Sequence, residues 1–152
     1  MTVLGIVVLV LLAAVLAGSG YAMYRFVVVP QRRTVKYAVS VEFRDEDILR
    51  RQRLTVHLGR ESGREPGEGT GDLVLTADRL WFIHAASATK LDVALKDVTD
   101  VDLVSTHLGR TTGPPLLRVR FRTGDGSDST AFHLPYQDEW RLAIDNLRTR
   151  TE

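Results

Sequence analysis

The chain has 152 residues, a formal net charge of +1 and no cysteine. This length predicts one globular domain plus a short additional segment. The missing cysteines exclude disulfide bonds and thiolate chemistry. The chain has 20 basic and 19 acidic residues. This near balance argues against nucleic acid as a partner, because the net charge is too small to attract a polyanion.

The first predicted element is a transmembrane helix from Val3 to Tyr24, a segment without a charged side chain. At about 1.5 Å per residue this helix is about 33 Å long, enough for a hydrocarbon core of about 30 Å. A cleaved signal peptide is the alternative, since small residues around Ala17 and Ala22 have cleavage-like spacing, but the basic n-region is missing. We therefore expect residues 1–29 to be an uncleaved anchor whose partner is the lipid bilayer.

Basic residues follow this helix and none precedes it; they are Arg25, Arg32, Arg33 and Lys36. The positive-inside rule then predicts a plasma-membrane protein with its N-terminus outside and its C-terminal domain in the cytoplasm. Pro30 is expected to end the helix because proline has no N–H to donate. Residues 30–36 are expected to form a basic juxtamembrane linker.

A stripe of small residues, Ala14, Gly18 and Ala22, recurs every four positions of the helix. Such stripes let two membrane helices approach closely, which predicts a helix-mediated homodimer. Small residues are also common in membrane helices that do not pair, and this alternative stays open.

Residues 37–152 are expected to form one β-rich domain. Tyr37 to Phe43 alternates apolar and polar side chains, which predicts a half-buried strand. Leu54 to Leu58 alternates again, and the glycine-rich segment Gly59 to Gly71 is predicted to be a hairpin loop. Further strands are predicted over 73–75, 80–83, 91–95, 101–103, 117–121 and 132–134. Seven or eight short strands with this spacing predict a sandwich or a small antiparallel barrel.

The C-terminal segment has helical spacing, with Trp140, Ile144 and Leu147 on one face. Acidic residues precede this stripe and arginines follow it, which favours the helix dipole. A single amphipathic helix covers an open barrel end with its apolar face, so Trp140 is expected in the core.

Two motifs in the domain resemble a known fold. Gly71 to Phe82 reads GDLVLTADRLWF, and Val93 to Val101 reads VALKDVTDV. The first is similar to the G-x-L-x-L-T-x-x-R-L-x-F hairpin of GRAM and bacterial PH-type domains in the PH-like superfold. The second resembles the I-P-L-x-D-I-x-x-V step between two strands of that family. The resemblance implies a mainly β, PH-like barrel of seven or eight strands capped by a C-terminal helix, with structural roles for Gly71, Trp81 and Trp140.

Catalytic and metal-binding motifs are not recognisable, and we expect neither an enzyme nor a cofactor or metal. The histidines lack the spacing of a zinc site; they are His57, His84, His107 and His133. Ser105 and Thr106 beside His107 belong to no nucleophile elbow or triad. Asp97, Asp100 and Asp102 lack EF-hand spacing.

One candidate anion or partner patch remains, formed by Arg118, Arg120 and Arg122. Alternation places the three guanidinium groups on one outer strand face, and arginine suits phosphate and carboxylate ligands. The alternative is that these arginines pair with Asp100 and Asp102 on a neighbouring strand.

The expected function is that of a non-catalytic, membrane-anchored PH-like binding module, acting by protein contacts or weak headgroup contacts at the inner membrane surface. Its protein partner is not identified by the sequence. Two alternatives remain: an accessory or scaffold subunit of a membrane complex, and a phosphoinositide-binding domain that uses the three arginines.

Overall fold

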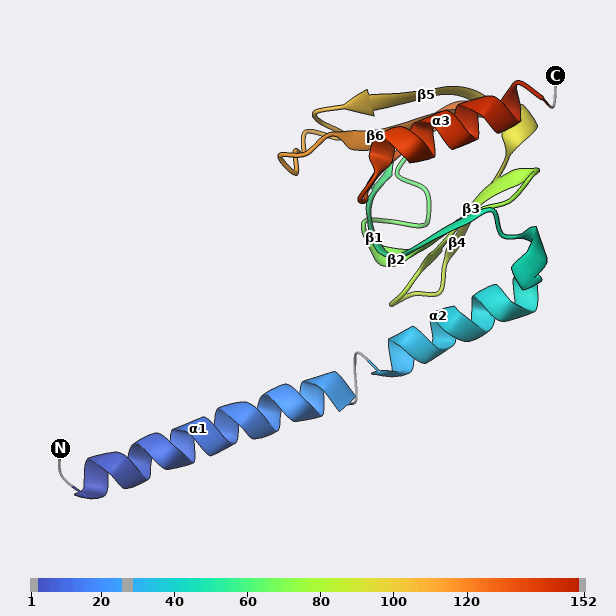
Figure 1. Cartoon of the computed structure of the whole chain (residues 1–152). Helices are drawn as coiled ribbons and strands as arrows, with labels where there is room; N and C mark the ends of the chain where they lie inside the picture. The colour runs from blue at the N-terminus through green and yellow to red at the C-terminus, as the bar shows by residue number, and fades with distance from the viewer. Residues whose placement is uncertain (1–2, 26–28, 151–152) are drawn as a thin grey trace.

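A computed structural model of the chain describes residues 3–25 and 29–150, with side chains from Val8 to Arg25 and from Thr34 to Arg150. Two helices precede the sheet: α1 (Val3–Met23) and α2 (Val29–Glu42) (Figure 1). Over these described residues, no helix is both long and apolar enough to cross a membrane. The expected transmembrane helix is therefore not supported by the structure.

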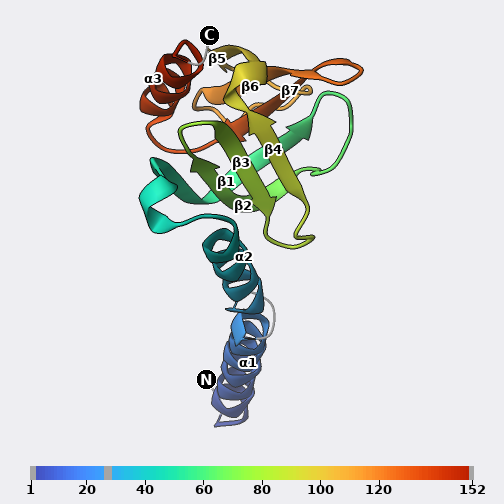
Figure 2. The same cartoon turned by 90° about the vertical axis from the view of Figure 1, so that its right-hand side faces the viewer.

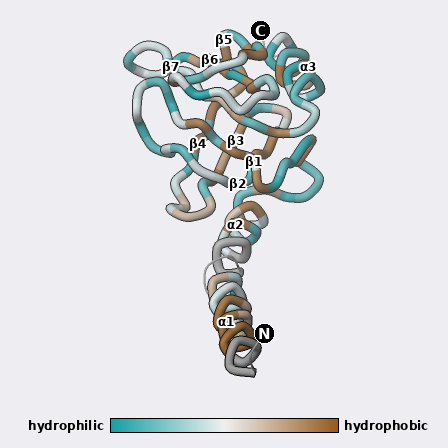
Figure 3. Tube along the Cα trace, turned by 90° about the vertical axis from the view of Figure 1, so that its left-hand side faces the viewer, coloured by the Kyte–Doolittle hydropathy of each residue, from teal (hydrophilic) through white to brown (hydrophobic). Residues whose placement is uncertain are grey.

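From Val8 to Met23, helix α1 exposes its side chains on every side, and in Figure 3 much of this helix has the brown colour of hydrophobic residues. Leu9, Val10 and Leu11 are 62%, 61% and 60% exposed, although successive residues of an α-helix point about 100° apart. The helix therefore has no side that the rest of the described chain covers.

Helix α2 corrects two expectations. Pro30 does not end a helix but lies in the first turn of α2, where the missing N–H has no helical partner in any case. The predicted strand at Tyr37 to Phe43 is also wrong, because α2 continues to Glu42. Its apolar residues serve two faces: Val39 and Phe43 are buried, whereas Tyr37 is 71% exposed.

The buried face of α2 covers the outer surface of the sheet. Val35, Val39 and Phe43 pack against Val74, Trp81 and Ile83. The rings of Phe43 and Trp81 meet edge to face at 5.2 Å, and Glu42 Oε1 lies 3.2 Å from Arg79 Nη1. Residues 30–36, expected as a basic juxtamembrane linker, lie within α2, and Val35 belongs to the face that packs on the barrel.

Seven strands form one antiparallel sheet in the order β4-β3-β2-β1-β7-β6-β5. The strands are β1 (Arg50–Arg60), β2 (Gly69–Leu75), β3 (Arg79–His84), β4 (Lys90–Ala94), β5 (Val98–Val104), β6 (Leu116–Thr123) and β7 (Gly126–His133). The short 3-10 helix η2 (Asp45–Asp47) leads into β1, and η3 (Leu95–Asp97) joins β4 to β5. Strands β4 and β5 stand at the two ends of this order and do not pair with each other, so they are the two edge strands of the sheet.

The main core lies inside the curved sheet and is closed by α3 (Gln137–Arg148), which lies along β5 and β6 (Figure 1). Trp140 and Ile144 of α3 are 3% and 0% exposed and pack with the inward residues of the strands. The expectation of an antiparallel PH-like sheet capped by a C-terminal helix is confirmed, with seven strands in the described residues.

Candidate functional site

The three arginines of the predicted patch lie on β6, beside the edge strand β5. Asp102 is opposite Arg118, and Asp100 is opposite Arg120. Arg118 donates from Nε to Asp102 Oδ1 at 2.9 Å and from Nη2 to Asp102 Oδ2. Arg120 donates from Nη1 to Asp100 Oδ2 at 2.5 Å. The cross-strand pairing that the sequence left open as an alternative is thus present.

These pairs neutralise most of the patch. The hydrogen bond from Arg118 lowers the pKa of Asp102, although burial opposes the shift, and the same contact raises the pKa of Arg118. Both groups therefore stay charged over the ordinary pH range. A phosphate placed here would compete with two carboxylates already bound, so the face resembles a ladder of ion pairs more than an anion site.

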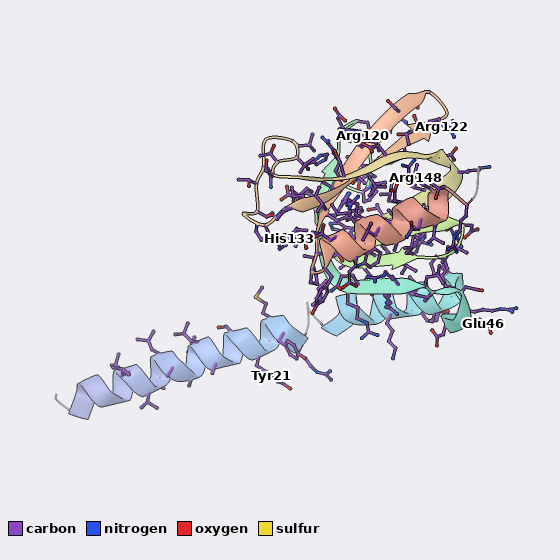
Figure 4. All side chains as sticks on the ribbon, turned by 45° about the horizontal axis from the view of Figure 1, so that its top comes forward. Tyr21, Glu46, Arg120, Arg122, His133 and Arg148 are labelled. Carbon is purple, nitrogen blue, oxygen red and sulfur yellow. The ribbon has the colours of Figure 1, made fainter. Side chains whose placement is uncertain are left out.

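Arg122 differs from the other two. Its Nη2 donates to the backbone oxygen of Lys96 at 2.6 Å, and no carboxylate in the described part of the chain pairs with it. Figure 4 shows Arg120 and Arg122 together on the side of the barrel away from Glu46. The charge of Arg122 is thus turned toward η3 and the end of β4.

A groove lies next to Arg122, between the free edge of β4 and the end of β6. Its volume is about 310 Å³. Every residue of β4 lines one side, and the remaining lining residues are Arg60, Asp97, Phe121, Arg122 and Thr123. In Figure 2, β4 is the outermost strand on this side, below the connection that leads to β5. Sequence reasoning missed this groove because only the folded sheet shows which strand is an edge.

A second hollow of about 470 Å³ lies where η2 meets the β2–β3 turn. It is lined by Glu42, Glu46, Asp47 and Asp78 together with Arg79. Glu42 pairs with Arg79, and Asp78 Oδ1 accepts a hydrogen bond from Thr76 at 2.7 Å. Two of the four acidic side chains in this hollow therefore stabilise the β2–β3 turn and its contact with α2.

A buried carboxylate holds the loop between β1 and β2. Asp128 accepts hydrogen bonds from Arg60 Nε at 2.8 Å, from Ser62 N at 3.0 Å and from Ser62 Oγ at 2.6 Å. Burial raises the pKa of Asp128, but the hydrogen bonds from Ser62, Ser129 and Arg60 outweigh it and the net shift is downward. Farther along this loop, Arg64 pairs with Asp125 in the turn between β6 and β7. The glycine-rich loop is therefore tied to the β6–β7 hairpin.

The histidines serve the fold. His57 is fully buried, with Nδ1 2.8 Å from Gly67 O and Nε2 2.5 Å from Thr130 Oγ1. Desolvation lowers the pKa of His57 to about 4, and burial also lowers the pKa of His107. A neutral His57 that donates from Nδ1 to Gly67 O satisfies Nε2 by accepting the one hydroxyl proton of Thr130, whose other contact, to Gly59 O, is longer at 3.1 Å.

No group of three acidic or histidine side chains in the described residues is arranged to hold a metal. His84 is the last residue of β3, and His133 is the last residue of β7. His133 is labelled at the start of the segment that leads into α3 in Figure 4.

The residues given structural roles are all packed. Trp140 lies in the main core, whereas Trp81 lies on the outer face of the sheet under α2. A Cβ at Gly71 would lie 2.0 Å from Ile83 O and 2.6 Å from the Phe82 ring, so no larger residue fits.

The basic residues around the two N-terminal helices are only partly placed. Arg25 and Lys36 are exposed, and the side chains of Arg32 and Arg33 lie outside the described part. On α1, a Cβ at Gly18 would meet nothing within 4 Å, so the small-residue stripe of Ala14, Gly18 and Ala22 is open along the single chain.

No family model and no curated protein matches the chain. Solved structures do. A chain of the 8S snRNP assembly intermediate matches with a TM-score of 0.52 and 12% identity over 70% of this chain and 85% of that one. The Vps36 N-terminal PH domain matches with a TM-score of 0.50 and 14% identity over 68% of this chain and 80% of that one. At such identities the likeness concerns the fold alone, and the fold is PH-like.

Proposed function

We propose that the chain is a non-catalytic PH-like binding module, of the GRAM or bacterial PH type, which α1 anchors in a membrane with its N-terminus outside and the barrel on the cytoplasmic side. The observation that carries this proposal is the pairing of a PH-like barrel with a helix that is apolar on every side. A helix of that character is covered by other apolar matter, either a protein core or lipid.

A bilayer fits α1 better than a protein groove, because a groove covers one side of a helix and leaves the other in water. Tyr21 and Tyr24 are 68% and 52% exposed at the C-terminal end of α1, followed by the exposed Arg25. Aromatic and basic residues in this order are typical of the boundary between hydrocarbon and headgroups. Tyr21 points outward from α1 in Figure 4.

The barrel supports binding rather than catalysis. His57, whose pKa is lowered by burial, lies between the rings of Phe82 and Phe132 and has no exposed surface for a substrate. The β6 arginines act mainly as partners of Asp100 and Asp102, which disfavours the phosphoinositide alternative. A protein contact of the barrel, with headgroup contacts left to Arg25 and the basic start of α2, is the function we favour.

Membrane insertion and orientation can be tested together because the chain has no cysteine. We expect the full chain to stay in the membrane pellet after alkaline carbonate extraction. A Ser127→Cys variant, which places a thiol on the exposed start of β7, should react with a membrane-impermeant thiol reagent only after the cells are opened.

A Thr2→Cys variant is the matched control and should react in intact cells. Release of the chain by carbonate would show that α1 is not inserted, and the membrane part of the proposal would be wrong. Labelling of Ser127→Cys in intact cells would reverse the orientation.

A further inference from the structure

We propose that the free edge of β4 binds an extended peptide segment as an additional strand, with an acidic residue of that peptide on Arg122. This inference rests on the proposed function, because it names the surface and the partner chemistry of the binding module.

Most backbone groups on the outer side of β4 have no partner among the described residues. His84 N donates to Thr89 O at 2.9 Å, and the register continues with Phe82 opposite Leu91 and Leu80 opposite Val93. Hydrogen bonds alternate along an antiparallel pair, so Leu91 and Val93 bond to β3.

Lys90 and Asp92 therefore direct their N–H and C=O groups to the free edge, and Ala94 directs its N–H there; the C=O of Ala94 belongs to the first turn of η3. Among the described residues, no backbone or side-chain group bonds to these outward groups. Unpaired strand edges of this kind are templates for another strand.

The groove gives this edge room for a strand. The space of about 310 Å³ borders the full length of β4 and is bounded on the far side by Phe121 and Thr123. Leu91 and Val93 are buried beside it. A strand added to β4 would turn alternate side chains toward Phe121 and the others to solvent, so the peptide needs apolar residues at every second position.

The other edge of the sheet is not equivalent. Strand β5 lies against α3, and Arg148 Nη1 donates to the outward oxygen of Thr99 at 3.3 Å. The helix thus covers the β5 edge, whereas no element of the described chain covers β4.

The groove as a whole carries mixed charge, because Asp97 lines it as well as Arg122; an acidic peptide residue is favoured at Arg122 itself. Asp92 is already paired with Arg79 at 2.8 Å, while Arg122 has only a backbone oxygen and lies at the end of the groove near η3. A second copy of the chain fits less well, because an antiparallel pair of β4 strands centred on Asp92 would set two carboxylates opposite each other.

Proline at position 94 is the sharpest test of the edge. Ala94 has φ −64° and ψ 135°, which proline adopts without strain, and its N–H points away from β3. Ala94→Pro therefore removes one donor from the free edge and leaves the β3–β4 ladder intact. Ala94→Ser is the control, because it changes the side chain and keeps the N–H.

The probe is a phage-displayed library of random dodecapeptides, selected on the full-length chain in mild detergent. We expect recovered peptides to alternate apolar and polar residues and to carry an acidic residue. They should bind wild type and Ala94→Ser alike and bind Ala94→Pro about tenfold more weakly or worse, since a backbone bond is lost and the proline ring obstructs the edge. Bound peptide should slow amide hydrogen exchange at Lys90 and Asp92.

The charge is tested with Arg122→Gln, which should weaken the acidic peptides severalfold, against Arg44→Gln, an exposed arginine outside the groove that should have no effect. Peptides that bind Ala94→Pro as well as wild type would overturn the β4 edge and leave the proposed function standing. A selection that recovers no peptide would also overturn the inference. A change in oligomeric state in Ala94→Pro would show that the occupant is a second copy. Loss of membrane retention would refute the anchor without touching the peptide result.

Discussion

Acidification should destabilise the barrel through His57 before it affects the carboxylates. The fold lowers the pKa of this histidine from 6.5 to about 4, so the native state favours the neutral ring. The unfolded chain binds the proton first as the pH falls. The stability that the neutral ring contributes is present above about pH 6.5 and is lost progressively down to about pH 4.

The magnitude follows from the two pKa values. At about pH 5 the unfolded chain is largely protonated at this site and the native chain is not, which costs about 2 kcal/mol of unfolding free energy relative to about pH 7.5. Below about pH 4 the full cost approaches about 3 kcal/mol. Asp102 and Asp128 also have lowered pKa values, but their contribution is lost at lower pH, because it is complete above the usual carboxyl pKa of 3.8.

Urea unfolding of the full chain, followed by the fluorescence of the two buried tryptophans, measures this slope. The comparison is with His57→Gln, whose amide can donate to Gly67 O and accept from Thr130 but does not titrate. Between about pH 7.5 and pH 5, wild type should lose about 2 kcal/mol more than the variant. His107 titrates in both proteins and cancels. Equal losses in the two proteins would show that burial does not govern the protonation of His57.

Three further changes test the packing. Trp140→Ala should lower the unfolding free energy by about 3 to 5 kcal/mol, read as a large fall in melting temperature; an unchanged melting temperature would place the ring outside the core. Gly71→Ala should prevent normal pairing of β2 with β3, because its Cβ would lie 2.0 Å from Ile83 O, whereas Gly67→Ala, with nothing within 4 Å of its Cβ, should fold normally by circular dichroism. Phe43→Ala should cost about 3 kcal/mol and shift the Trp81 emission to longer wavelength, while Tyr37→Ala on the exposed side of α2 should change stability by less than about 0.5 kcal/mol.

The strands and the last helix were predictable because each has a single buried face. Leu117, Val119 and Phe121 alternate with arginines, and Trp140 and Ile144 recur with helical spacing. Such periods reflect the geometry of a strand or helix against one core.

Helix α2 was missed because its apolar residues satisfy two periods at once. Tyr37, Val39, Val41 and Phe43 alternate like a strand, yet only Val39 and Phe43 are buried. A signal for the correct structure was nevertheless present in β3, where Leu80 to Ile83 is apolar without interruption. A continuous apolar run in a strand indicates cover on both faces of the sheet, and α2 provides the second cover.

The peptide groove could not be predicted in the same way. Nothing in the residues of β4 distinguishes an edge strand from an inner one, because that property depends on the order of all seven strands. The pairing of Arg118 with Asp102 could be anticipated as an alternative, because alternation determines which residues face each other on adjacent strands. That Arg122 binds a backbone oxygen instead of a carboxylate could not be anticipated.

The docking of α2 also determines where the chain can be cut. A fragment that begins at Tyr37 divides the helix, removes Val35 and weakens the cover over Val74, Trp81 and Ile83. The uncovered apolar surface would promote self-association in a preparation intended to be monomeric. A fragment that begins near Val29 keeps the complete helix and its contacts. For crystallisation or solution NMR, the boundary of the folded unit therefore lies before Pro30.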